Sequence, residues 1–405
     1  MNDIVETTAK ASSRERLRPR PALLSPVVER PDRRVPFVRR VAAFLRRPRF
    51  RGHLLSAVTT LAWEWWIAQI ADLREWRTPG SRLLNKWTGA DSLLRASSVA
   101  IYVHYAPGDR VSDMVLRQVK EYRSQGFTVI FVSMCRSLDR NDVERLRGVT
   151  GLVLQRRNFA LDFGAWQDVM PLLDNLAPDI RELLLVNDSV CGPLTSMFGV
   201  FGNIRGCGDG LFGLTENLVP RPHLQSYFLL ARGRAAVADL MHFIRRMRLS
   251  SYKRAIIRRG EVRLSGWMRR RGHLVASPNG YEGVEWLALQ RPRAMRRLGT
   301  IFPKAGRART HSEWVEELRH FPVNPTHTFW YELVECCGFP FLKTEMLLRN
   351  PLGLTDVGDW RELLASVSSD ELRDVIESHL WSMGKASAGR HSTANSMARS
   401  SASRP

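Results

Sequence analysis

Short apolar runs rich in β-branched residues alternate with stretches of helical periodicity between residues 98 and 231. The strand-like runs cover residues 98–104, 127–133, 151–154, 183–186, 211–215 and 226–231. Helical patterns occupy residues 112–124, 141–147 and roughly 163–176. This alternation predicts βα units around a mostly parallel sheet that is covered on both faces. Helical patterns dominate from residue 235 to about residue 380, so we expect an α/β fold with a helical C-terminal portion.

The segments outside this alternation differ from it in composition. The N-terminus is basic and rich in Arg and Pro, and the C-terminus repeats Ser, Ala and Arg, which predicts disorder at both ends. The expected organisation is a disordered N-terminus at 1–40, an amphipathic helical segment at 41–95, the α/β domain at 96–300, a helical C-terminal portion at 301–383 and a disordered tail at 384–405.

One helical segment combines tryptophan with arginine. Residues 54–70 are largely apolar, and arginines at 46, 47, 49 and 51 precede them. On a helix, apolar side chains from Leu55 to Trp76 gather on one side, although Gln69 and Asp72 fall on or beside it. Such a helix suits a membrane interface. It could equally pack on its own domain or on a partner.

The positive charge of the chain is concentrated in two regions. Lys and Arg number 61 against 40 Asp and Glu, a net charge of +21, of which residues 1–95 carry +10 and residues 232–320 carry +14. Such regions could attract phosphodiesters, anionic lipid headgroups or an anionic substrate, or could be ordinary solvated helix faces. The five cysteines lack disulfide or zinc-ligand spacing, and residues 1–50 contain no secretory signal core, so we expect a cytoplasmic protein.

Polar residues follow several of the expected strands, where α/β sheets bind ligands. The first strand ends in a Pro-Gly turn at residues 104–109, which could expose backbone amides beside a nucleotide-sized crevice. After the third strand, Asp162 stands directly before a helix, and Gly164 would let another group approach the helix start. Asp162 could bond a ribose or sugar hydroxyl, or could simply be the helix N-cap.

The fourth strand delivers three polar residues together to the edge of the sheet. Asn187, Asp188 and Ser189 directly follow a continuous apolar run. A carboxylate here could hold a divalent cation against substrate phosphates. The alternative is that Asp188 caps the turn that follows.

Two further segments carry candidate polar groups. His223 and Gln225 stand at the start of the next apolar strand, where a lone histidine is more often structural than catalytic. Glu261 opens an amphipathic helix, a position that the helix dipole favours for glutamate. If Glu261 faces the crevice, it could also act as a general base toward an acceptor hydroxyl.

Taken together, these segments resemble the rhamnan synthesis protein F family, glycosyltransferase-like proteins of bacterial surface-polysaccharide assembly. The resemblance covers about residues 98–365. The matching stretches are VHYAPGD (103–109), NFALDFGAW (158–166), ELLLVNDSVCGP (182–193), GDGLFGLTE (208–216), HLQSYFLLARGRA (223–235), EVRLS (261–265) and NPTHTFWYELVECCGFPFLKTEMLLRNP (324–351).

This resemblance implies a GT-A-like glycosyltransferase fold that uses a nucleotide sugar, in this family often dTDP-rhamnose. The Asn187-Asp188-Ser189 run lies where such folds carry an Asp-x-Asp motif, but only one of the two carboxylates is present. Asp188 would therefore be the ligand of any Mg²⁺ or Mn²⁺. By the same likeness, the donor-binding residues would be Asn158, Asp162, Gly164, Asn187, Asp188, Ser189, His223 and Gln225. Glu261 would be the catalytic base, with Asp162 as the second candidate.

The expected function is transfer of a sugar from a nucleoside-diphosphate sugar to a glycan or lipid-linked glycan, at the inner face of the cytoplasmic membrane. The basic regions and the Trp-rich helix would then contact an anionic membrane surface. A non-catalytic assembly scaffold that keeps the fold is the alternative. Nucleic-acid binding is not expected, because the chain lacks a zinc finger, an RNA-binding aromatic signature and a helix-turn-helix pattern.

Overall fold

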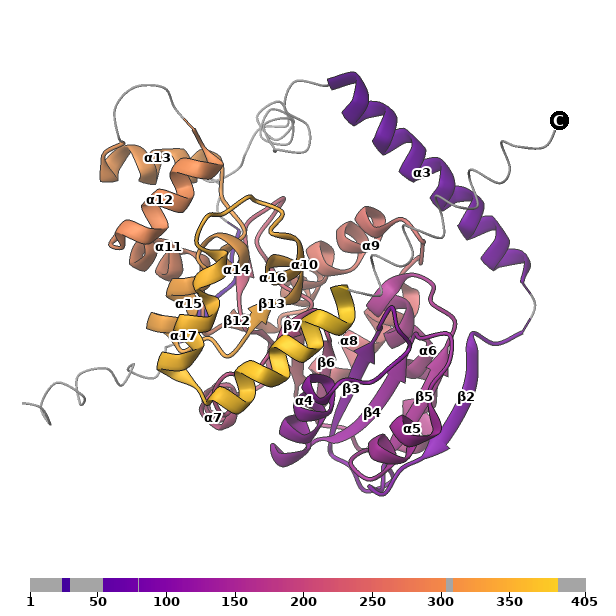
Figure 1. Cartoon of the computed structure of the whole chain (residues 1–405). Coiled ribbons are helices and arrows are strands. Elements are labelled where there is room, and N and C mark those ends of the chain that lie inside the picture. The colour runs from indigo at the N-terminus through magenta and orange to yellow at the C-terminus, as the bar shows by residue number, and fades with distance from the viewer. Residues whose placement is uncertain (1–23, 30–53, 79, 304–308, 385–405) are drawn as a thin grey trace, which may run out of the picture.

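The computed structural model describes residues 24–29, 54–78, 80–303 and 309–384. A nine-stranded sheet forms the centre of this described part, with strand order β1-β12-β8-β11-β6-β3-β4-β5-β2 (Figure 1). The strands are β1 (Ser25–Pro26), β2 (Leu83–Thr88), β3 (Ser98–His104), β4 (Thr128–Ser133), β5 (Leu152–Arg156), β6 (Glu182–Asn187), β8 (Gly210–Gly213), β11 (Phe228–Arg232) and β12 (Leu274–Ser277). Within this sheet, β1, β2 and β11 run against the other six strands. The expected α/β class with a mostly parallel sheet is thus confirmed.

Each strand-like run in the sequence corresponds to a strand, with ends that differ by at most two residues. The structure adds β2, β12 and β1, which the sequence analysis missed. The sequence of β2, LLNKWT, places Asn85 and Lys86 in an edge strand, and β12 is only four residues long. β11 is antiparallel because no helix separates it from β8, so the chain cannot cross over to a parallel position.

Helices cover both faces of the sheet. Alternate residues of β3 face opposite layers: Ala100 and Tyr102 pack on one side, and Val99, Ile101 and Val103 on the other. The helices between residues 113 and 270 are α4 (Asp113–Ser124), α5 (Arg140–Arg147), α6 (Leu161–Leu176), α7 (Phe198–Gly206), α8 (Arg234–Arg246), α9 (Lys253–Arg259) and α10 (Glu261–Arg270). The three expected helices in the α/β region are therefore confirmed as α4, α5 and α6.

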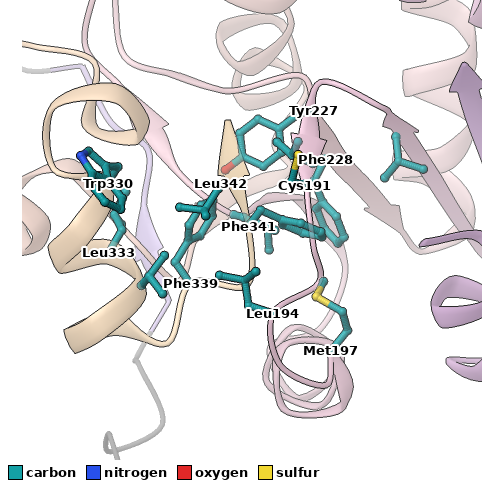
Figure 2. Close-up of a cluster of buried hydrophobic side chains, with 14 of the residues drawn as sticks. Cys191, Leu194, Met197, Tyr227, Phe228, Trp330, Leu333, Phe339, Phe341 and Leu342 are labelled. Atoms are coloured by element: carbon teal, nitrogen blue, oxygen red, sulfur yellow. The ribbon is translucent and has the colours of Figure 1, made fainter. Parts of the chain in front are cut away.

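The region from residue 281 to residue 384, which includes the expected C-terminal portion at 301–383, is mainly helical in its described residues and shares its core with the sheet. It contains α11 (Tyr281–Leu289), α12 (Pro292–Ile301), α13 (His311–His320), α14 (Pro325–Thr328), α15 (Trp330–Cys337), α16 (Thr344–Arg349), the 3₁₀ helix η4 (Val357–Asp359), α17 (Trp360–Val367) and a helix at residues 370–384. A short strand of this region, β13 (Leu342–Lys343), pairs with β7 (Val190–Cys191), which lies directly after β6. Figure 2 shows Phe339 and Phe341 close to Tyr227 and Phe228 of the sheet layer, and Trp330 belongs to the same buried cluster. A boundary at residue 301 therefore does not separate two cores.

Two expected boundaries near the N-terminus are wrong. The segment 1–40 was expected to be disordered, but β1 lies within it and pairs with β12, and Val27 is buried. Likewise β2 belongs to the central sheet rather than to the helical segment 41–95. The other residues of 1–53, including the arginines before the Trp-rich helix, and residues 385–405 lie outside the described part of the chain.

The Trp-rich segment is a helix, α3 (Leu54–Arg77), that extends away from the body in Figure 1. Asp72, which interrupted the apolar side, binds the Ser250 hydroxyl and the Ser251 amide, both at 2.6 Å. Around these anchors the apolar side remains uncovered: Trp66 is 60% exposed and Trp76 is 83% exposed. In the described residues, no helix combines the length and apolarity needed to cross a membrane.

Candidate functional site

The carboxyl ends of β3, β4 and β5 meet at one edge of the sheet and border a pocket of about 540 Å³. That volume lies within the range of small-molecule sites. Its lining includes Tyr105, Pro107, Asp109, Arg136, Arg157 and Asn158. A larger open groove of about 970 Å³ lies between α17 and the helix at 370–384, and no candidate site residue lines it.

Three backbone amides of the Pro-Gly turn after β3 are hydrogen-bonded within the protein. The amide of Tyr105 donates to Asp188 Oδ2 at 2.6 Å, and the amide of Ala106 donates to Cys135 Sγ at 3.3 Å. The amide of Asp109 donates to the Ala106 carbonyl at 3.2 Å. The expectation that this turn exposes its amides is wrong for these three residues. The turn instead connects the pocket wall to Asp188.

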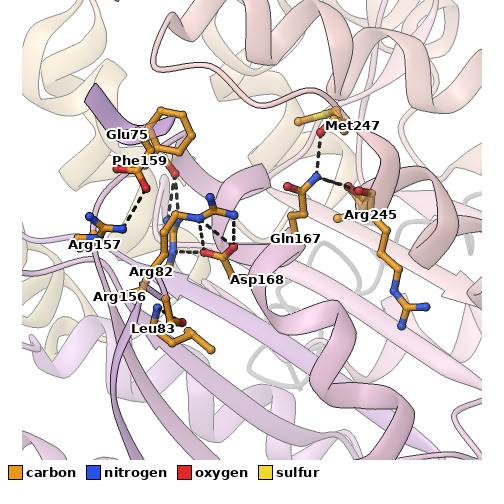
Figure 3. A network of polar contacts seen from close by, with 12 residues as sticks. Glu75, Arg82, Leu83, Arg156, Arg157, Phe159, Gln167, Asp168, Arg245 and Met247 are labelled. Atoms are coloured by element: carbon orange, nitrogen blue, oxygen red, sulfur yellow. Dashed lines mark hydrogen bonds and ion pairs between the residues drawn. The ribbon is translucent and has the colours of Figure 1, made fainter. Parts of the chain in front are cut away.

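A buried ion cluster holds the segment between β5 and α6 (Figure 3). Arg156 is fully buried, binds Asp168 at 2.9 Å and donates to the Phe159 carbonyl at 3.1 Å, and Arg82 also binds Asp168. The same carbonyl leaves no room for a side chain at position 164, because a Cβ added to Gly164 would lie 2.3 Å from the Phe159 oxygen. Gly164 is therefore required by a turn of this chain, and it is buried behind the site.

Asp162 lies in the first turn of α6 and points toward the end of β6. The N-cap is Ala160, so the alternative in which Asp162 caps the helix is wrong. Asn187 Nδ2 donates to Asp162 Oδ2 at 2.8 Å. Asn187 Oδ1 in turn accepts from the Ser189 amide at 3.1 Å and from the Ser189 hydroxyl at 2.6 Å. The two polar segments singled out in the sequence thus form one hydrogen-bonded unit.

The electrostatics of this unit favour proton transfer at Asp162. Burial raises the pKa of Asp162 to about 6, and the nearby Glu261 carboxylate adds to the rise, while Lys343 and Lys253 oppose it. Asp162 Oδ1 has no hydrogen-bond partner among the described residues. A carboxylate with a free oxygen and a pKa near neutrality is suited to accept a proton.

Asp188 does not form a cation cage with its neighbours. Burial raises its pKa to about 8, against the opposing hydrogen bond from the Tyr105 amide. Its neighbours in sequence are an amide and a hydroxyl, and the ammonium of Lys343 lies 3.4 Å from Ser189 Oγ. The described residues contain no group of three or more His, Cys, Asp or Glu side chains that could hold a metal ion. One carboxylate close to an ammonium is a poor donor set for Mg²⁺ or Mn²⁺.

Glu261 begins α10, beside the start of α6. The close approach depends on Gly260, where an added Cβ would lie 2.6 Å from the Phe163 ring. Glu261 Oε2 accepts from Ser226 at 2.7 Å, and Oε1 lies 3.4 Å from His223 Nε2. Burial alone would raise the pKa of Glu261, but the bond and charge of His223, with Ser226, hold that pKa below its ordinary value.

His223 and Gln225 support the site from behind. His223 is 1% exposed, and its Nδ1 lies 2.6 Å from the Arg221 carbonyl. Gln225 is also buried and connects Thr215 at 2.7 Å with Asn324 at 3.3 Å. His223 therefore orients the Glu261 carboxylate, and Gln225 links the strand region to Asn324 of the C-terminal portion.

The sequence analysis missed Lys343. It belongs to β13, and burial lowers its pKa to about 8, while Glu261 and Asp162 oppose that change. The available signal was a single charged residue in the otherwise uncharged run 338–344 (GFPFLKT). The pocket residues Arg136 and Arg157 were also not predicted, because an arginine after a strand is common.

The chain resembles proteins of polysaccharide synthesis. Residues 129–269 match the family model described as "Rhamnan synthesis protein F", which supports the suspected resemblance over that part of the chain. Among curated proteins, the chain is similar to the uncharacterized protein y4gN of Sinorhizobium fredii, with 27% identity over 42% of this chain and 45% of the relative. The alignment thus spans less than half of that relative. The virulence protein VirA of Vibrio anguillarum is 24% identical over 56% of this chain and 73% of its own length.

A solved structure was also matched. It is a cytidylyltransferase from Leptospira borgpetersenii, with 12% identity over 56% of this chain and 96% of that chain. The TM-score is 0.26.

Proposed function

We propose that this chain, whose residues 129–269 match the rhamnan synthesis protein F family, is a glycosyltransferase. It would transfer a sugar from a nucleoside-diphosphate sugar to a hydroxyl of a growing surface polysaccharide or its lipid-linked precursor. The family match supports a role in polysaccharide synthesis. The observation that carries the chemistry is the pairing of Asp162 with Asn187 at the strand ends, beside a pocket of about 540 Å³.

In this proposal the donor lies along the sheet edge. The nucleoside occupies the pocket, where Asn158 and Arg136 can bond its ribose or base. The diphosphate extends toward Asn187, Asp188 and Ser189. The sugar then faces Asp162, with Glu261 on its far side. Rhamnose is the first donor sugar to test, because of the family.

Asp162 is the preferred catalytic base, in place of Glu261. Both oxygens of Glu261 are engaged, by His223 and Ser226, and its pKa is lowered, which makes it a weak base. Asp162 has a free oxygen and a pKa of about 6. Glu261 would instead remain ionised and stabilise positive charge that develops on the sugar ring.

The reaction is a single displacement at the anomeric carbon. The acceptor oxygen forms a bond to that carbon while the bond from the carbon to the diphosphate oxygen breaks. The acceptor proton passes to Asp162, and the electron pair of the broken bond leaves with the nucleoside diphosphate. The transition state resembles an oxocarbenium ion, so catalysis depends on positioning and charge.

The helix α3 supports a membrane location for this chemistry. Its anchored side faces Ser250 and Ser251, while Trp63, Trp66 and Trp76 are exposed. Amphipathic tryptophan side chains favour the boundary between lipid headgroups and acyl chains. We propose that this face contacts an anionic membrane surface, where lipid-linked acceptors are found.

A non-catalytic scaffold is the second candidate, favoured by the missing second carboxylate after β6. The two candidates differ in their response to Asp162→Asn and Glu261→Gln. An enzyme with Asp162 as base loses about 10²- to 10⁴-fold in turnover with Asp162→Asn, and retains donor affinity. Transfer of labelled sugar to a membrane extract measures this. Unchanged transfer in Asp162→Asn overturns Asp162 as base, and cellular function retained by both variants favours the scaffold.

A further inference from the structure

The position of Lys343 is fixed by the pairing of two short strands. In the register of β13 with β7, Lys343 lies opposite Val190, two residues after Asp188. The amide of Thr344 donates to the Ser189 carbonyl at 3.1 Å and fixes the same corner. The C-terminal portion thereby brings the Lys343 side chain to a site whose other polar groups, Asp162 and Glu261, belong to α6 and α10.

The direct contacts of the Lys343 ammonium are uncharged. Nζ lies 3.4 Å from Ser189 Oγ and 4.0 Å from the centroid of the Tyr227 ring. The carboxylates of Asp162 and Glu261 are near enough to influence Lys343, but among the described residues neither forms an ion pair with it. Placing an ammonium in such surroundings is unfavourable unless a negative group approaches it.

The diphosphate of the proposed donor would bring a negative group to the Lys343 ammonium. Two like-charged carboxylates, Asp162 and Glu261, border the site and would repel a diphosphate. A cation is therefore needed between them and the ligand, and the donor set around Asp188 does not suit a divalent ion. Lys343 lies beside Ser189, at the place where the diphosphate would lie.

We propose that the Lys343 ammonium binds the donor diphosphate and stabilises the departing nucleoside diphosphate, so that donor binding does not require a divalent cation. This inference rests on the proposed function. The lysine acts as a point charge toward phosphate oxygens, as lysines commonly do in phosphate sites. If Lys343 only packs on Tyr227 and balances the nearby carboxylates, its replacement will not distinguish a diphosphate from a nucleoside.

Isothermal titration calorimetry of the full chain in EDTA distinguishes diphosphate binding by Lys343 from a purely structural role. The probes are UDP, dTDP and GDP, and the tightest of them is then compared with its own nucleoside. The variants are Lys343→Met, Lys343→Arg and the matched control Lys120→Met, which removes an exposed lysine of α4 beside the opposite edge of the sheet.

We expect Lys343→Met to weaken diphosphate binding by about 10- to 100-fold, the range of a charge-assisted hydrogen bond. The affinity of Lys343→Met for the nucleoside should stay within about twofold of that of the unaltered chain, and this also shows that the variant is folded. Lys343→Arg should recover part of the lost diphosphate affinity. Equal diphosphate affinity in Lys343→Met, or binding by the unaltered chain only with Mn²⁺ or Mg²⁺, overturns the inference. Absence of binding by any nucleotide to the unaltered chain, with or without cation, overturns the proposed function itself.

Discussion

The side-chain amide of Asn187 donates a 2.8 Å hydrogen bond to the carboxylate of Asp162. The two residues are 25 positions apart, at the end of one strand and the start of a helix that follows another. Asn187 also accepts from Ser189, so its orientation is fixed by both partners. The bond aims Asp162 across the edge of the sheet, toward the proposed donor site.

Replacing Asn187 should therefore change the acidity of Asp162. Asn187 lowers the pKa of Asp162, and Asn187→Ala removes that bond, so the pKa should rise further above about 6. A base is active when deprotonated, and the acid limb of the pH profile of kcat/KM should move to higher pH. Because less of Asp162 is then deprotonated, kcat/KM should fall several-fold near pH 6 and less at higher pH. An unchanged acid limb would contradict the assignment of Asp162 as base.

Buried neutral histidines should make the fold sensitive to acid. Burial, together with the nearby His379, lowers the pKa of His104 to about 3, and burial lowers that of His379 to about 4. Because the unfolded chain binds these protons near pH 6.5, stability that is full above that pH is lost as the pH falls toward the folded pKa.

For His104 the expected loss between pH 7 and pH 5 is about 2 kcal/mol. His104→Gln should lack this contribution, so the difference in unfolding free energy between the variant and the unaltered chain should shrink by that amount at pH 5. Urea unfolding at both pH values measures it. A difference that does not depend on pH would show that His104 is not held neutral.

A buried ion pair should hold the C-terminal helices together. Arg297 binds Glu332 at 2.6 Å, and each side chain is 1% exposed. Arg297 also binds Asp356 at 2.8 Å. Arg297→Met leaves Glu332 buried without its partner and should cost about 3–5 kcal/mol in unfolding free energy.

The double variant Arg297→Met with Glu332→Leu provides the control, because it removes both charges. It should recover much of the stability that the single variant loses. If the two variants are equally unstable in urea, lost packing rather than an unpaired charge is responsible.

The exposed face of α3 should bind anionic vesicles. Changing Trp63, Trp66 and Trp76 to Ser removes three large side chains that are exposed in the structure, and should weaken sedimentation with phosphatidylglycerol vesicles by more than about 10-fold. Trp381→Ser is the matched control, because Trp381 is 63% exposed but lies in the C-terminal helix. Equal vesicle binding by the triple variant and the control would exclude α3 as the contact.

The sequence predicted the strands that consist of a continuous apolar run, because a strand buried on both faces requires apolar residues. It missed β2, an edge strand that carries Asn85 and Lys86, because exposed strands are not constrained in that way. It also singled out Asp162 and Asp188 from their positions after strands, and their roles stay predictions. It could not identify Lys343, since the pairing of β13 with β7 joins segments about 150 residues apart. Nor could it show that Gln225 is buried in a side-chain network.

Equilibrium binding of nucleotide sugars to the full chain tests the central claim most directly. The panel is dTDP-rhamnose, UDP-glucose and GDP-mannose, each titrated into the unaltered chain and into Asp162→Asn. We predict saturable binding of one nucleotide class by both proteins, because Asp162 acts on the acceptor proton rather than on the nucleotide. Absence of binding by the unaltered chain to every donor, at concentrations far above ordinary dissociation constants and with Mn²⁺ or Mg²⁺ present, would contradict the account.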